Sequence, residues 1–201
     1  MKNFILLLIV ASITLTAAGQ NQVANLKLSD WPKDHREAVE KMIKKYGQPD
    51  EATASMVKWN NKGPWKKIII YKEEWDHKFP KAHKDFVEQY IDYKAPVEKY
   101  DDIAKYDGSV TVIRTPGEMA ARCDKEEMNF LALNLANEVA TGKRTVDDAR
   151  EFYAKTAMEF MSGNSSPYIE KLLFTVSKGN TGDPDENMPM KALSKEEKRK
   201  Q

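Results

Sequence analysis

The stretch TASMVKWNNKGPWKKIIIYK (53–72) decides the fold of this chain. Its two ends, TASMVKW (53–59) and WKKIIIYK (65–72), are rich in β-branched and aromatic residues, and the NNKGP between them is rich in turn formers. This pattern predicts a β-hairpin. Because Ile68, Ile69 and Ile70 are consecutive and β-branched, we expect the second strand to be buried on both faces.

The segment before the hairpin has the pattern of a helix that begins near Asp30 and ends at Gly47. Asp30 is a candidate N-cap, Pro32 suits the first turn, and glycine is common just after the last turn. Apolar residues recur on one side at helical spacing, namely Val39, Met42, Ile43 and Tyr46.

The segment after the hairpin alternates between irregular and regular patterns. Residues 73–85 have no clean period and contain a proline, so we expect a loop. Residues 86–93 alternate as in a strand, and 97–108 resemble a short helix that ends at a glycine. A second hairpin is expected from SVTVIR (109–114) and EMAARC (118–123), with the turn Thr-Pro-Gly between them.

The last third of the chain is predicted to be helical. Asp124 is a candidate cap for a helix over 125–141, and Thr145 for a helix over 146–161. Because only about four residues connect them, the two helices should pack antiparallel. The sequence therefore predicts an α+β fold, in which a small antiparallel sheet of two hairpins packs with a C-terminal antiparallel helical hairpin.

The domain organisation follows from these patterns. Residues 20–29 form a polar leader, 30–176 a single globular domain, and 177–201 a disordered tail without periodicity. Within the domain, the order of elements also allows two helix–hairpin units, 30–93 and 94–124, followed by helices over 125–176.

The N-terminal segment MKNFILLLIVASITLTAAG (1–19) has the features of a secretory signal peptide. Lys2 supplies the positive start, a long apolar run follows, and small residues precede the expected cleavage site. The apolar run is too short for a membrane span, so no transmembrane segment is expected in the mature chain. We expect an exported protein, periplasmic or extracellular.

Charge and cysteine content narrow the function classes. The chain has 32 basic and 31 acidic side chains, and removing a signal that contains Lys2 leaves 31 of each. This neutral balance argues against nucleic acid as a partner. Cys123 is the only cysteine, so no internal disulfide can form. We expect Cys123 to be a small buried side chain, the alternatives being a nucleophile or an intermolecular bridge.

A divalent metal is the cofactor that the sequence suggests. His77, His83 and Asp85 fall within nine residues, and imidazole and carboxylate are ligands of zinc and similar ions. The spacing matches no familiar zinc signature. The alternative is that both histidines are loop residues that bond to backbone or water.

Three further groups are candidates for ligand contacts. Arg114 and Arg122, with Glu118 and Asp124 near them, could bind an anion or form internal ion pairs. Trp65 and Trp75, together with Trp59 and Phe79, could stack on a ligand or pack in the core. Asn129, Asn134 and Asn137 lie on an apolar helix and should bond to a neighbouring element.

No motif for serine acyl transfer, phosphate binding, dinucleotide binding or dithiol exchange is present in the sequence. The sequence therefore favours a non-enzymatic binding or interaction protein, whose partner is a protein or a small-molecule ligand. The alternative is a metal-dependent hydrolase that uses His77, His83 and Asp85. The oligomeric state is not encoded in any pattern that we recognise.

Overall fold

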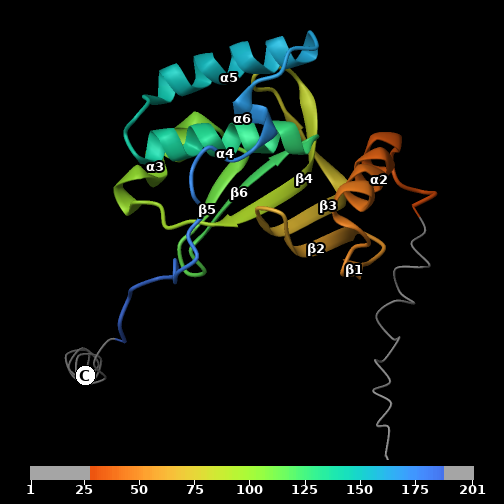
Figure 1. The fold of residues 1–201 in the computed structure, drawn as a ribbon, viewed down its shortest axis with the longest axis horizontal. Helices are drawn as coiled ribbons and strands as arrows, with labels where there is room; N and C mark the ends of the chain where they lie inside the picture. Colours follow the sequence, from red (N-terminus) through yellow and green to blue (C-terminus); the bar gives the residue numbers. More distant parts are fainter. Residues whose placement is uncertain (1–27, 188–201) are drawn as a thin grey trace, which may run out of the picture.

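The computed structural model describes residues 28–187. The predicted signal peptide therefore lies outside the described residues, as do most of the leader and the last part of the tail. The fold is α+β, with one six-stranded antiparallel sheet in the order β1-β2-β3-β4-β6-β5 (Figure 1). Its elements are α2 (Lys33–Tyr46), β1 (Glu51–Ala52), β2 (Met56–Lys62), β3 (Trp65–His77), β4 (His83–Asp92), a 3₁₀ turn (Val97–Lys99), α3 (Tyr100–Tyr106), β5 (Val110–Ile113), β6 (Glu118–Cys123), α4 (Glu126–Ala140), α5 (Val146–Met161) and α6 (Pro167–Glu170).

The predicted first hairpin is confirmed as β2 and β3, in which Val57 pairs with Ile70. The expectation that β3 is buried on both faces is wrong, because Ile68 and Ile70 are buried while Ile69 between them is only half-buried. Alternate side chains of an antiparallel strand point to opposite faces. The isoleucine run therefore supplies the core from one face of the sheet and a partly open surface from the other.

The sheet is larger than the small one that we predicted, because residues 73–85 are mostly strand. Here β3 continues to His77 and β4 begins at His83, so that only a short turn separates them. The register between β3 and β4 shifts between Ile70 and Trp75, which marks a bulge or irregularity. A bulge breaks the alternation of side chains, which explains why this part of the sequence shows no clean period. β4 then pairs with β6 and joins both predicted hairpins in one sheet.

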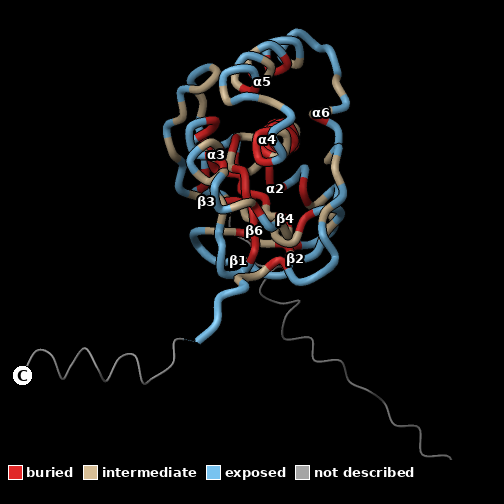
Figure 2. Tube along the Cα trace, turned by 90° about the vertical axis from the view of Figure 1, so that its left-hand side faces the viewer, coloured by how far each residue is buried: buried red, intermediate tan, exposed pale blue. Residues whose placement is uncertain are grey.

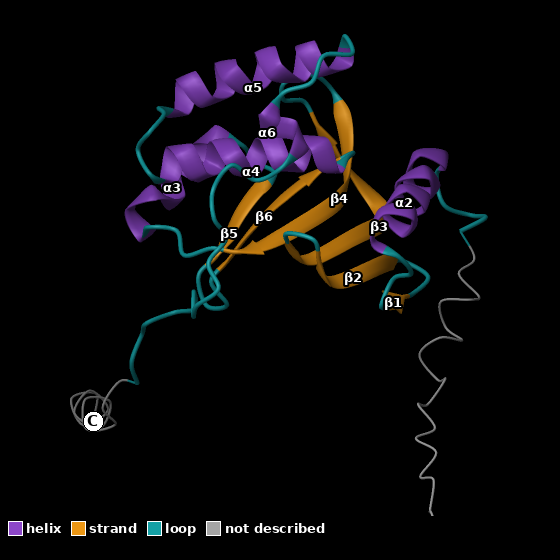
Figure 3. Ribbon diagram, in the orientation of Figure 1, coloured by secondary structure: helices purple, strands orange, loops and turns teal. Residues whose placement is uncertain are grey.

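The C-terminal helices form two layers on the sheet. Figure 3 shows α4 lying across the strands, with α5 outside it and running in the opposite direction, as the short connection predicts. Nearly all of α4 is buried (Figure 2). On α5 the buried residues are Ala149, Tyr153, Thr156 and Ala157, whereas Phe152 and Phe160 are half-buried.

The far end of the β3–β4 hairpin passes between α2 and α5 (Figure 1). On the α2 side, the ring of His35 stacks on Phe86 with 3.8 Å between centroids. On the α5 side, Phe79 of the turn lies 5.2 Å from the ring of Tyr153. Asp85 and Phe86 are adjacent in a strand, so they point in opposite directions. This alternation directs Asp85 towards α5.

Helix capping agrees with the sequence-based prediction at Thr145 and differs from it at Asp124 and Asp30. Thr145 caps α5 by accepting a 3.1 Å hydrogen bond from the amide of Asp148, and Ser166 accepts one from Tyr168 at the start of α6. Asp124 does not cap α4 but pairs with Lys125, with 2.9 Å between their charged atoms. Asp30 does not cap α2 but pairs with Lys72, because α2 begins three residues later.

The asparagines of α4 bond to neighbouring elements, as we predicted. Asn129 donates to the carbonyl of Val87 and to the Gln89 side chain, which fixes α4 on β4. The amide of Asn134 donates to the carbonyls of Tyr168 and Lys171, which fixes the α6 segment. The hydrogen bonds of these side-chain amides set the position of α4 in the interior.

Residues 177–187 contain no helix or strand, but part of this segment contacts the sheet. The hydroxyl of Thr181 is buried and donates a 2.8 Å hydrogen bond to the carbonyl of Gly117. Gly117 has a φ of +65°, and a Cβ there would lie 2.0 Å from the carbonyl oxygen of Thr181. The turn between β5 and β6 is therefore shaped to receive this segment.

Candidate metal centre

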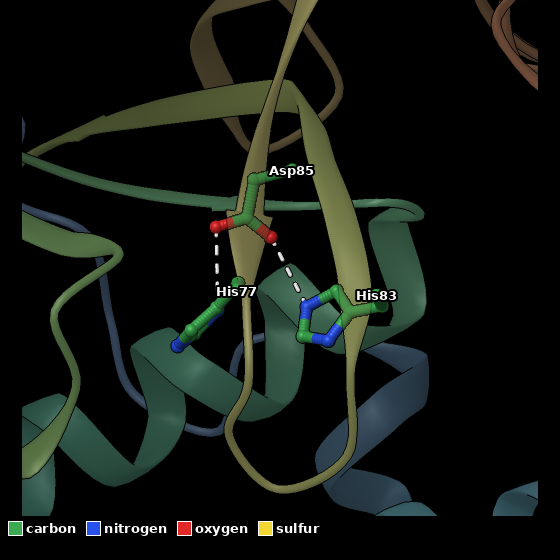
Figure 4. Close-up of side chains that lie close together, drawn as sticks. All are labelled: His77, His83 and Asp85. Atoms are coloured by element: carbon green, nitrogen blue, oxygen red, sulfur yellow. Dashed lines mark ion pairs between the residues drawn. The ribbon is translucent and has the colours of Figure 1, made fainter.

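The β3–β4 hairpin brings the three predicted metal ligands together. His77 is the last residue of β3 and pairs with His83, the first residue of β4. Asp85 follows two residues later and so lies on the same side of the strand as His83. One ligand atom from each residue lies within 4.8 Å of the others (Figure 4). The cluster thus depends on the extension of both strands, where we had expected a loop.

The carboxylate of Asp85 is the centre of this cluster. Its side chain is only 4% exposed, and its two oxygens face different imidazoles. Oδ2 lies 3.2 Å from His77 Nδ1, and Oδ1 lies 3.0 Å from His83 Nε2. The hydroxyl of Ser109 donates a hydrogen bond to Oδ2. Oδ1 has no hydrogen-bond partner among the described residues.

The tautomer of His83 follows from its other ring nitrogen. Nδ1 lies 2.7 Å from the carbonyl oxygen of Lys81, and a carbonyl only accepts, so Nδ1 carries a hydrogen. In the neutral imidazole, Nε2 then has a lone pair that faces the Asp85 oxygen 3.0 Å away. Two acceptors at this distance repel each other unless a cation, either a proton or a metal ion, lies beside both.

The electrostatics of the cluster agree with this geometry. Burial raises the pKa of Asp85, but the interactions with His77, His83 and Ser109 outweigh burial and lower this pKa to about 2. The neighbouring Asp85 carboxylate raises the pKa of His83. Asp85 is therefore an anion at neutral pH. Its negative charge favours a cation, either a proton or a metal ion, at Nε2 of His83.

Other groups support the ligands from behind. Lys81 holds the His83 ring through its carbonyl, and Ser109 holds the Asp85 carboxylate. Asp107 lies 3.7 Å from His77 Nε2, and its burial raises the pKa of this carboxyl. Such partners orient metal ligands in proteins. Ser109 and Asp107 could not be found from local sequence patterns, because only the pairing of β5 with β6 brings them close to β4.

The arrangement is not that of a serine or cysteine nucleophile. Ser109 Oγ lies 3.0 Å from His77 Nδ1, but its hydroxyl donates to Asp85 instead of His77. Asp107, at the other ring nitrogen, is 3.7 Å away, which is too far for the hydrogen bond that a relay needs. Cys123 is buried, as predicted, and its Sγ lies 3.3 Å from His83 Nε2. Burial raises the pKa of the Cys123 thiol well above its ordinary value, so the thiol is protonated at neutral pH.

The other predicted ligand residues lie in three separate places. Trp65 is buried in the core against Phe130 of α4. Arg122 lies on the sheet face opposite α4, where its guanidinium is 4.3 Å from the centre of the Trp75 ring. Arg114 is at the end of β5 and pairs with Asp183 and Asp185.

The predicted cluster of Arg114, Glu118, Arg122 and Asp124 is also not assembled. Ile113, not Arg114, pairs with Glu118 across the hairpin. Glu118 forms ion pairs with Lys66 and Lys67 instead, and Arg122 donates a 2.7 Å hydrogen bond to Glu88. Both arginines therefore form ion pairs with carboxylates of the protein itself.

Comparisons with known proteins found no matching family model, no matching curated protein and no matching solved structure. Within residues 28–187, no helix combines the length and apolar character needed to cross a membrane.

Proposed function

We propose that this chain is an exported protein that binds a divalent transition metal ion, of which zinc is the representative, through His77, His83 and Asp85. One observation carries the proposal. In neutral His83 the Nε2 lone pair faces the unbonded Oδ1 of buried Asp85 at 3.0 Å, and the weakly donating thiol of Cys123 lies 3.3 Å from the same nitrogen. A metal ion beside both atoms would remove this repulsion and would also be within reach of His77.

The chemistry of the three residues fits zinc. Neutral imidazole nitrogens and a carboxylate oxygen are its common protein ligands, and each ligand here has a supporting partner. The raised pKa of His83 adds a pH dependence, because a proton competes with the metal for Nε2. Zinc binding should therefore begin to weaken above pH 6.5, the ordinary imidazole pKa, and should weaken further as the pH falls.

Thermal melts with and without zinc test the proposal. In wild type at pH 7.5, zinc at 100 times its Kd should stabilise the fold by about 2.7 kcal/mol. His83→Ala and Asp85→Asn should lose this gain. His35→Gln is the matched control, because His35 is the third histidine of the chain and lies on α2, outside the cluster. Absence of a zinc effect in wild type would refute metal binding.

Metal-dependent hydrolysis is a second candidate, and one observation favours it. Three protein ligands leave a position for water on a four-coordinate zinc, as in catalytic zinc sites. Bound zinc would lower the pKa of such a water and supply a hydroxide nucleophile. The zinc-loaded protein should then hydrolyse p-nitrophenyl acetate, with activity lost on chelation and in Asp85→Asn. If zinc binds but no hydrolysis is measured, the hydrolase proposal is refuted and the proposed metal binding is retained.

A further inference from the structure

A pocket of about 230 Å³ lies beside the candidate metal centre. One wall is the turn between β3 and β4, and the other is formed by α5 and the start of α4. Its lining is apolar over most of its extent, with side chains that include Pro80, Met128, Tyr153, Ala157, Phe160 and Met161. His83 and Cys123 are among its polar lining residues. The pocket thus connects an apolar surface with a metal ligand.

The apolar surface of α5 continues to the mouth of this pocket. Met161, which lines the pocket, is 57% exposed, and Phe160 is half-buried. Both are large apolar residues of α5, but the structure leaves them partly exposed. Large exposed apolar side chains beside a concave site are typical of ligand binding.

The lining of the pocket also includes cationic side chains. Asp124 and Lys125 pair with each other at 2.9 Å. Lys81 also lines the pocket and forms no ion pair among residues 28–187. A negatively charged head group beside His83 would therefore be attracted by a lysine of the pocket lining as well as by the metal.

We propose that the pocket binds the apolar chain of a small carboxylic acid or acyl compound, with the head group directed to the metal at His83. The placement of the head group rests on the proposed metal site. The site for the apolar chain of the ligand, called the chain site below, rests on the pocket alone. An apolar cavity of about 150 Å³ can hold benzene. The larger volume here is suited to a chain of about six carbons.

Hydroxamates of two lengths test the proposal, because they ligate zinc through the head group whatever the chain. The zinc-loaded protein is titrated with acetohydroxamate and with hexanohydroxamate. Each added methylene that enters an apolar site improves affinity roughly fourfold. Hexanohydroxamate, with four more methylenes, should bind on the order of 100-fold more tightly. Equal affinities would overturn the chain site while leaving the metal site intact.

Two exposed methionines of α5 give a matched pair of variants. Met161→Asp places a carboxylate at the mouth of the pocket and should remove the preference for the longer chain, without changing acetohydroxamate binding. Met158 is 60% exposed and is not part of the lining, so Met158→Asp should keep the preference. The same loss in both variants would contradict the assignment of the pocket.

A metal-free arm separates the two proposals. Saturable binding of 1-hexanol, but not of ethanol, is followed through the NMR signals of the methionine methyl groups. Hexanol should bind to wild type and to Met158→Asp but not to Met161→Asp. If zinc fails to bind but hexanol binds to wild type and to Met158→Asp and not to Met161→Asp, the metal site is refuted and the pocket for the apolar chain is supported. If hexanol does not bind, the chain site falls.

Discussion

The indole Nε1 of Trp65 donates a 2.7 Å hydrogen bond to Oε1 of Glu126, although 61 residues separate them in the chain. The same carboxylate accepts hydrogen bonds from Tyr46 and Gln89 and forms an ion pair with Lys45. Glu126 therefore joins α2, β3, β4 and the first turn of α4 at one buried anion. Its position at the start of α4 also suits the positive end of the helix dipole.

Loss of the Glu126 carboxylate should be strongly destabilising. Glu126→Leu leaves several buried donors unpaired, and breaking a buried charged network costs about 3–5 kcal/mol. Urea denaturation gives the free energy of unfolding directly. The neighbouring Glu127 is the control, because it is only half-buried, and Glu127→Leu should change stability by less than about 1 kcal/mol. Similar losses in both variants would show that the network is not the cause.

The lowered pKa of Asp85 predicts a specific pH dependence for the metal-free protein. The folded pKa is about 2, below the ordinary 3.8, so ionised Asp85 contributes stability above pH 3.8 that is lost as the pH falls towards 2. With EDTA present, wild type should exceed Asp85→Asn by about 2 kcal/mol at pH 6. This difference should shrink between pH 4 and 2. The exposed Asp147 serves as control, since Asp147→Asn should show no such trend.

The close contact between Gly117 and Thr181 predicts that the segment after residue 177 affects the stability of the fold. Gly117→Ala should cost well over 1 kcal/mol, because it combines a φ of +65° with a clash against the Thr181 backbone. Gly142 has a φ of +72° and nothing within 4 Å of an added Cβ, so Gly142→Ala should cost only about 1 kcal/mol. Truncation after Lys178 removes the clash and should make the two substitutions equal in thermal melts. A persistent difference would mean that Thr181 is not docked.

Export of the protein is a prediction of the sequence alone. We expect the mature protein from its native host to begin between about residues 19 and 21, because the small residues there suit a signal peptidase. Intact mass spectrometry of the purified protein checks this. Protein that retains residues 1–19 would contradict the assignment to the periplasm or the cell exterior.

The local signals of the sequence were sufficient for most elements. The turn formers after Trp59, the cap at Thr145 and the proline after Ser166 each act within a few residues, so their effects can be read from the sequence. The union of two hairpins into one sheet depends on β4 pairing with β6, which is a contact between residues such as Val87 and Cys123. No local pattern specifies such a pairing.

The candidate site was predictable in part for the same reason. His77, His83 and Asp85 are close in sequence and could be grouped by residue type. The bulge after Ile70 interrupts the alternating pattern of β3, so the strands that align the three ligands could not be recognised from the sequence. The supporting residues Ser109 and Asp107 come from a distant segment of the chain. The turn between β5 and β6 is one residue longer than the Thr-Pro-Gly turn that we predicted, so Ile113 instead of Arg114 pairs with Glu118.

The unequal lengths of the strands have a consequence for the behaviour of the protein in solution. The edges of the sheet are the short β1 and β5, with 2 and 4 residues, while the long β3 and β4 are interior. Beyond β1, the backbone amide of Asn60 on β2 donates to the side chain of Asp50. Short edges with occupied backbone groups offer little template for another strand. The sheet should therefore resist edge-to-edge aggregation and should not recognise partners by adding a strand from another chain.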